Sequence, residues 1–243
     1  MTRKNNLTPP SSGNSATGAA IDAFLHEARR VSPLERRDKS QPRLVFALDA
    51  TMSRQPTWDL ACRVQGQMFA QADQAGGLLV QLVYFRGFDE CRSSRWVEDS
   101  RALTDLMTKI GCRGGLTQIG RVLRHVRTEA SRLPLRVLVY VGDAMEEPVD
   151  ELCRIAGELG LLGVKAFMFH EGQDPDAARA FQEIARLTGG AYARFDSAAP
   201  QTLSELLRAA AAYASRGVDG LTRLAPASSQ AQALLTAMRG HKP

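Results

Sequence analysis

From residue 43 onward, short apolar runs alternate with longer amphipathic stretches along the chain. The apolar runs have the length and composition of buried strands, and the predicted strands are 43–49, 78–85, 136–143, 164–170 and 191–195. The stretches between them repeat apolar residues at helical spacing, and the predicted helices are 56–73, 99–110, 117–133, 148–163, 174–190 and 202–217. One further run, "ECRSSRWV" at 90–97, alternates polar and apolar residues after the turn-like "RGFD". It is typical of a hairpin partner at a sheet edge.

Strands that alternate with helices along a chain favour an α/β fold with parallel strands. We therefore predict a doubly wound, mostly parallel central sheet with one antiparallel edge strand and helices on both faces. Local signals place several helix ends: Pro56 near a first turn, the stop at Gly189–Gly190, and a T-x-x-E capping box formed by Thr202 and Glu205.

The two ends of the chain have a different character from the middle. Residues 1–18 are rich in Asn, Ser, Thr, Gly and Pro and are expected to be disordered, while 20–30 place apolar residues on one helical stripe. We predict that residues 1–42 form a basic N-terminal arm with a short amphipathic helix. Residues 43–215 are expected to form the folded domain, and 216–243 a mobile or loosely docked tail.

Composition and charge exclude several classes of protein. The chain has 243 residues, 44% of them apolar, and a formal charge of +5, but its basic residues are dispersed rather than gathered on one stretch. A nucleic-acid partner is therefore not expected, because a phosphate-tracking surface needs clustered Lys and Arg. No apolar run approaches the roughly 20 residues that a membrane helix requires, and no secretory signal follows the first residues.

The four cysteines are Cys62, Cys91, Cys112 and Cys153. They lie far apart, without the C-x-x-C spacing or clustered His of a zinc site, so we interpret them as reduced thiols. Reduced thiols are typical of a cytoplasmic protein, and this is the expected location.

Three predicted loops bring oxygen-bearing side chains to one place. The loop "DATMS" after the first strand contains Asp49, Thr51 and Ser53, the loop "GCRGGLT" contains Thr117, and the strand at 136–143 ends in Asp143. In a doubly wound sheet, ligands bind beyond the carboxyl ends of the strands, so these loops are expected to converge. Residues two apart in an extended turn project to the same side. The side chains of Ala50 and Met52 should then point the other way and pack against the rest of the domain.

Two carboxylates and three hydroxyls, without Cys or His, suit a hard cation such as Mg²⁺, which prefers about six oxygens. The pattern closely resembles the metal-ion-dependent adhesion site of von Willebrand factor A domains, in which D-x-S-x-S is followed by a Thr and then an Asp. The resemblance extends over residues 43–213. Thr51 stands where the family has Ser, and "GGLT" places one residue between the second glycine and Thr117.

The resemblance implies a Rossmann-like von Willebrand factor A fold. No residue supplies a nucleophile with an activating base, so no catalytic activity is predicted. The resemblance also implies that Mg²⁺ or Mn²⁺ is held by Asp49, Thr51, Ser53, Thr117 and Asp143, directly or through water. A cation held largely by neutral hydroxyls stays electrophilic, so we predict a protein partner that offers an exposed Asp or Glu to the metal, with Met145, Glu146 and Glu147 bordering the contact. Intracellular members of the family often work beside a chaperone-like ATPase or in a multiprotein assembly.

Other interpretations of the same residues remain open. Thr51, Ser53 and Thr117 could simply cap the helices that follow them, with Asp49 accepting backbone N–H groups. Glu146 and Glu147 could belong to a solvated loop. Asp49 and the later "GDAMEE" also have features of haloacid dehalogenase phosphatases, although Thr51 stands where that chemistry needs a second Asp. Finally, the domain could be a scaffold with an idle metal site that binds through its helices or its arm.

Several other side chains could be assigned to packing or to function. Trp58 and Met145 lie near the predicted rim of the site, and packing is the preferred interpretation of both. His125 and His170 have no partner at a spacing that suits catalysis, so neither is predicted to be functional.

Overall fold

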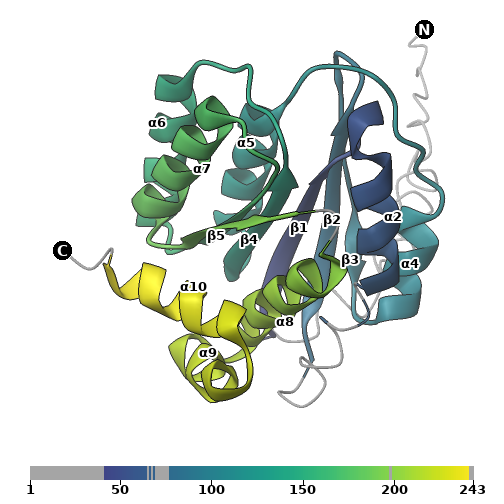
Figure 1. Ribbon diagram of the computed structural model, residues 1–243. Coiled ribbons are helices and arrows are strands. Elements are labelled where there is room, and N and C mark those ends of the chain that lie inside the picture. The colour runs from purple at the N-terminus through teal and green to yellow at the C-terminus, as the bar shows by residue number, and fades with distance from the viewer. Residues whose placement is uncertain (1–40, 65, 67, 69–76, 197–198, 241–243) are drawn as a thin grey trace, which may run out of the picture. The chain divides into compact units, whose positions relative to one another are not determined.

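The computed structural model describes residues 41–64, 66, 68, 77–196 and 199–240. The predicted arm lies outside these residues except for its last two positions, so the expected disorder and helix there stay predictions. Across the described chain the sheet has six strands in the order β3-β2-β1-β4-β5-β6 (Figure 1). Their bounds are β1 Arg43–Asp49, β2 Leu79–Arg86, β3 Glu90–Val97, β4 Leu135–Gly142, β5 Lys165–Glu171 and β6 Ala191–Phe195.

All neighbouring strands are parallel except the hairpin of β2 and β3, which is antiparallel and lies at one edge. This confirms the predicted sheet. The outer strand β3 exposes charged side chains, including Arg92 and Arg95, whereas the opposite edge strand β6 has only five residues. β1 lies between β2 and β4, and its end at Asp49 pairs with Phe85 of β2.

Helices cover both faces of the sheet, as predicted (Figure 1). On one face α2 (Gln55–Val64), α4 (Ser100–Met107) and α8 (Pro200–Arg216) bury their apolar sides, and on the other α5 (Ile119–Ala130), α6 (Val149–Leu161) and α7 (Pro175–Thr188) do so. The side chains of β1 alternate between the two cores, and all seven of its residues are buried. Burial on both faces explains the unbroken apolar run in the sequence. No helix within the described residues has both the length and the apolar character needed to cross a membrane.

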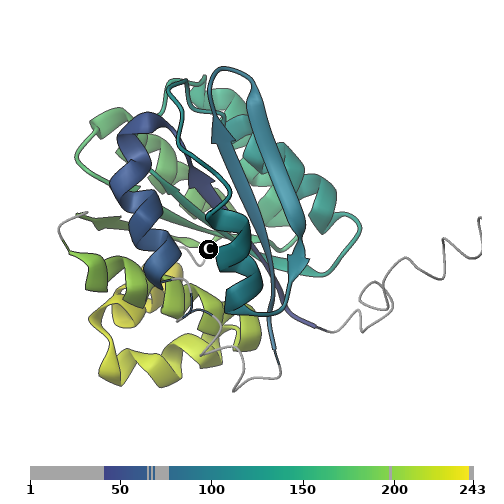
Figure 2. The same ribbon diagram turned by 90° about the vertical axis from the view of Figure 1, so that its right-hand side faces the viewer.

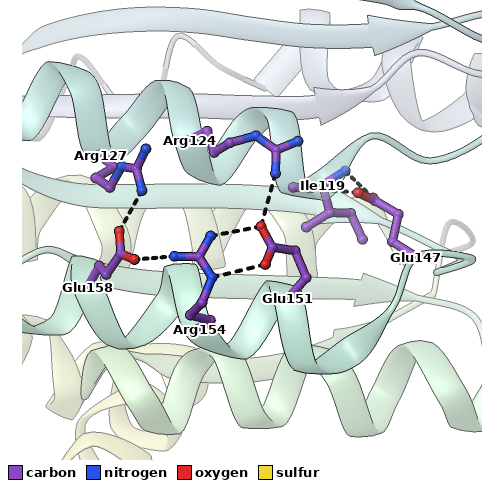
Figure 3. A network of polar contacts seen from close by, with 8 residues as sticks. Ile119, Arg124, Arg127, Glu147, Glu151, Arg154 and Glu158 are labelled. Carbon is purple, nitrogen blue, oxygen red and sulfur yellow. Dashed lines mark hydrogen bonds and ion pairs between the residues drawn. The ribbon is translucent and has the colours of Figure 1, made fainter.

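An ion-pair ladder joins the outer surfaces of α5 and α6 (Figure 3). Arg127 Nη1 lies 2.6 Å from Glu158 Oε2, Arg124 Nη1 lies 3.4 Å from Glu151 Oε1, and Arg154 pairs with both glutamates. These side chains are between about a third and a half exposed. Each pair is therefore expected to contribute less than about 1 kcal/mol.

The prediction of a mobile or loosely docked tail at 216–243 is wrong for most of that segment. Residues 218–240 form α9 (Val218–Leu224), the short 3-10 helix η3 (Ala225–Ala227) and α10 (Ser229–Gly240). They lie against α8, as both views show (Figures 1 and 2). Leu221, Leu234 and Leu235 are buried in the same core as α8. Ala231, Leu234 and Leu235 are spaced as on one face of a helix. This apolar stripe is hard to recognise in the sequence because the residues around it are small or polar.

The predicted capping box at Thr202 and Glu205 is also wrong. α8 begins at Pro200, so both residues lie inside the helix, and its N-cap Ala199 has no side-chain bond. Glu205 instead accepts a hydrogen bond of 2.8 Å from the Ser228 hydroxyl, which in turn accepts from the backbone N–H of Ala231 at the start of α10. The other helix-end signals are confirmed, since α2 has Pro56 in its first turn and α7 ends at Gly189 with φ of 60°.

Candidate metal centre

A cavity of about 170 Å³ lies beyond the carboxyl ends of β1 and β4. All five residues predicted to hold a metal line it, so the three loops converge as the strand-end rule requires. The complete lining is Asp49, Thr51, Met52, Ser53, Gly114, Gly115, Thr117, Asp143, Ala144 and Glu146.

The first loop is folded around the carboxylate of Asp49, which is only 2% exposed. The backbone N–H of Thr51 donates to Asp49 Oδ1 at 2.7 Å, and the hydroxyls of Thr51 and Ser53 lie 3.3 Å apart. The Ser53 hydroxyl also donates to Asp143 Oδ2 at 3.4 Å. A chain of polar contacts through the Ser53 hydroxyl therefore links the first loop to the loop after β4.

The neighbours of these residues only partly follow the predicted alternation. Ala50 is fully buried, as expected, but Met52 is 61% exposed and lines the cavity, so its predicted role in packing is wrong. Residues Met52–Arg54 form a 3-10 helix, η2, whose turn carries the Met52 side chain outward. Thr51 is the N-cap of η2, yet its side chain makes no capping bond. Its hydroxyl faces Ser53 instead.

The loop that carries Thr117 is held against the β2–β3 turn. The backbone N–H of Leu116 donates to the carbonyl of Gly87 at 3.2 Å, and a Cβ atom at Gly115 would collide with that same carbonyl. Two adjacent glycines before Thr117 would allow this loop to approach a metal closely. Gly114 and Gly115 do line the cavity, but the close approach that requires Gly115 is to Gly87.

Thr117 does not cap α5. That helix begins at Ile119, after Gln118, and Thr117 instead pairs reciprocally with Glu146. The Thr117 N–H donates to Glu146 Oε2 at 2.8 Å, while the Glu146 N–H donates to Thr117 Oγ1 at 3.2 Å. The reciprocal pair holds the Thr117 hydroxyl on the cavity wall and leaves that oxygen a second lone pair.

The cap of α5 comes from Glu147, whose carboxylate accepts bonds from the N–H groups of Ile119 and Gly120 (Figure 3). The segment is a loop and Glu146 is exposed, as the solvated-loop interpretation expects, but both carboxylates also accept backbone N–H groups at or just before the start of α5. Both glutamates tie the loop after β4 to the Thr117 loop. The sequence could not predict these contacts between the two loops, because two consecutive acidic residues after a strand are equally typical of a solvated loop.

Burial dominates the electrostatics of the site. It raises the pKa of Asp49 from 3.8 to about 6, an effect that the Thr51 hydrogen bonds and Arg54 reduce and that Asp143 reinforces. The ionised Asp49 carboxylate is therefore poorly compensated by the protein alone. A bound cation would supply the missing charge.

Two charged residues beside the cavity were missed by the sequence reasoning. The side chain of Arg54 is buried, forms an ion pair with Glu171 at the end of β5, and places Nε 3.8 Å from Asp143 Oδ1. The position of Arg54 directly after Ser53 was the available signal. Nothing in the sequence pairs it with Glu171.

The remaining rim candidates pack into the fold. Trp58 is 2% exposed, and Met145 packs against the core under α5–α7, which agrees with the packing interpretation. His170 is fully buried, with Nε2 3.3 Å from the carbonyl of Asp143 and Nδ1 2.9 Å from the Tyr192 hydroxyl. Because a carbonyl can only accept, His170 donates to it and supports the loop that carries Asp143.

The donor set fits a hard divalent cation. Among the described residues no group of three or more His, Cys, Asp and Glu side chains could hold a metal, so a site here depends on the hydroxyl oxygens. Two carboxylates and three hydroxyls around one cavity provide only oxygen donors, as Mg²⁺ and Mn²⁺ prefer.

No protein-family model and no curated protein matches the chain in sequence. Solved structures do resemble it. The von Willebrand factor A domain of SpRpn10 has a TM-score of 0.54 at 12% identity, covering 67% of this chain and 95% of that one. Proximal thread matrix protein 1 of the mussel byssus, with zinc in its metal-ion-dependent adhesion site, gives 0.54 at 16%, covering 70% and 48%. Manganese-loaded TRAP of Plasmodium vivax gives 0.50 at 14%, covering 70% and 74%.

These likenesses confirm the von Willebrand factor A fold that the sequence resemblance implied. The chain spans about half the length of the mussel protein. Zinc is named for the mussel protein and manganese for the Plasmodium protein, and the likeness in fold assigns neither metal to this chain.

Proposed function

We propose that this chain is a protein-binding domain that depends on a divalent cation, Mg²⁺ or Mn²⁺, held by the five oxygen-bearing residues of the cavity. The observation that carries the proposal is the meeting of these side chains, from three separate loops, around one cavity of about 170 Å³. If these residues were only helix caps or parts of a solvated loop, their side chains would have no reason to line the same cavity.

Each residue of the site would contribute in its own way. Thr51, Ser53 and Thr117 offer neutral oxygens, whereas Asp49 and Asp143 offer charge, directly or through water. When bound, the ion supplies an electrophilic position that can accept a carboxylate from outside the chain. The partner would therefore present an exposed Asp or Glu, and we propose that it belongs to a cytoplasmic multiprotein assembly or a chaperone-like ATPase.

An apolar rim, which we define as Met52, Phe88 and Leu116, supports a protein partner. These side chains are 61%, 78% and 51% exposed. Met52 lines the cavity, and the β2–β3 turn that carries Phe88 is bonded through Gly87 to Leu116. Exposed apolar side chains beside a polar site are typical of a protein contact. We propose no catalytic role, because Thr51 donates its N–H to Asp49 and stands where a phosphatase would need an acid.

Titration with Mg²⁺ or Mn²⁺ is expected to reveal one binding site in the intact protein. Ser53→Ala removes an oxygen donor and should weaken binding at least about tenfold, while Asp49→Ala should abolish it. Isothermal titration calorimetry measures both effects. Ser93→Ala, an exposed serine on β3, is the matched control and should leave the affinity unchanged. Absence of binding to the wild type at millimolar metal would refute the assignment.

Capture of the partner from a native cell extract is expected to require the metal. Chelation and an acid-to-amide change in the partner should each weaken capture strongly, and the two losses should not add, because both remove the same bond. Affinity pull-down with and without a chelator measures this. If the losses are independent, or if Asp143→Ala still captures the partner, the metal site is idle and the domain binds through another surface.

A further inference from the structure

The guanidinium of Arg54 lies behind the proposed metal site and is cut off from solvent. The residue is 2% exposed, and its Nη1 forms an ion pair with Glu171. Glu171 also accepts a hydrogen bond from the Thr57 hydroxyl. Its charge is thus shared between two donors on η2 and α2.

One donor of Arg54 remains unused. Nε is buried and has no hydrogen-bond partner in the described part of the chain, although it lies 3.8 Å from Asp143 Oδ1. That separation exceeds a hydrogen bond. The other oxygen of Asp143 receives the Ser53 hydroxyl at 3.4 Å. Asp143 therefore lies between a fixed positive charge and the hydroxyl cluster.

A buried positive charge at this place opposes a divalent cation. Both would draw on the charge of Asp143, and water does little to screen them from each other inside the protein. In the metal-free domain the same charge offsets the two carboxylates of the cavity. Arg54 is therefore expected to lower the affinity for metal and to raise the stability of the metal-free domain.

We propose that Arg54 is an internal counter-cation that lowers the affinity of the site for divalent metal and stabilises the metal-free domain. The inference rests on the proposed metal-binding function. Glu171 sets the strength of the effect, because it neutralises part of the Arg54 charge. The pair makes binding of the cation weaker and more readily reversible than the oxygen donors alone would allow.

Two variants of the full chain should move the metal affinity in opposite directions. Arg54→Met combined with Glu171→Gln removes both charges of the pair and is expected to tighten binding of Mg²⁺ or Mn²⁺ about tenfold. Glu171→Gln alone leaves Arg54 free to pair with Asp143 and should weaken binding by a similar factor. Isothermal titration calorimetry gives the dissociation constants. Thermal unfolding with chelator and with saturating Mn²⁺ gives the shift that the metal produces, which should be larger in the double variant than in the wild type.

The control is Arg127→Met with Glu158→Gln, which removes an ion pair between α5 and α6 and should leave the metal affinity unchanged. Arg54→Lys keeps the charge, so it should stay within about threefold of the wild type, and it provides the comparison if the double variant does not fold. The proposal is overturned if the wild type binds metal while both Glu171 variants shift the affinity in the same direction, or if Arg54→Lys tightens binding as a neutral residue would. A wild type that binds no metal would instead refute the proposed function.

Discussion

Replacing Asp49 by asparagine is expected to stabilise the metal-free protein by about 2 kcal/mol at pH 7 while abolishing its affinity for divalent cations. Burial raises the pKa of this carboxyl from 3.8 to about 6, and such a shift corresponds to roughly 3 kcal/mol of unfavourable charge burial at neutral pH. Asparagine removes that charge and can still accept the hydrogen bond from the Thr51 N–H. Its buried amide N–H groups, if unpaired, offset part of the gain.

The gain should depend on pH in a defined direction. Because the pKa of Asp49 is higher in the folded than in the unfolded state, protonation favours folding, and the stability it contributes is fully present below about pH 4. That contribution is lost as the pH rises to about 6. Urea denaturation in chelator should therefore find Asp49→Asn more stable than the wild type at pH 7 and nearly equal to it at pH 4.

Asp143→Asn is the matched control, since Asp143 is partly exposed and its side chain meets both Ser53 and Arg54. It should not reproduce the gain at pH 7. If Asp49→Asn proves less stable than the wild type at both pH values, the carboxylate is required by the fold itself. The idea that its burial destabilises the fold and is kept for metal binding would then be wrong.

Removal of residues 218–243 is expected to abolish stable folding. Burial of Leu221, Leu234 and Leu235 contributes about 2 kcal/mol for each side chain, and the sum is comparable with the net stability of a typical domain. The point variant Leu234→Ala should cost about 3 kcal/mol, whereas Thr236→Ala, on the exposed side of α10, should change the stability by less than about 0.5 kcal/mol. Chemical denaturation measures each. A shortened chain that unfolds at the wild-type midpoint would show that α9 and α10 are dispensable.

The sheet could be predicted because its central strands have an unambiguous pattern. All seven residues of β1 are buried, so the apolar run at 43–49 had no competing helical period. The convergence of the loops was predictable for a related reason: Asp49 ends β1 and Asp143 follows β4, and the carboxyl ends of these adjacent parallel strands must meet at one edge. Thr51 and Ser53 reach the same cavity through the turn of η2, and not through the extended alternation that the sequence predicts.

Apart from the orientation of Met52, which the local turn of η2 decides, the errors concern contacts between distant segments. Arg54 pairs with Glu171, and Glu147 caps the start of α5, through loop paths that local patterns do not encode. The box at Thr202 and Glu205 matched a genuine local signal, but Pro200 began the helix earlier and Ser228 engaged the glutamate. The helices after Gly217 were missed because their apolar stripe is short and acquires its partner only when α8 is in place.

The edges of the sheet bear on how the protein behaves when it is concentrated. An open edge strand offers unpaired backbone groups to a second molecule, which is a common route to aggregation. Here β3 exposes Arg92 and Arg95, whose like charges would oppose one another if two such edges met, and β6 is a short strand with α10 beside it. Growth of the sheet from one copy to the next is therefore disfavoured at both ends.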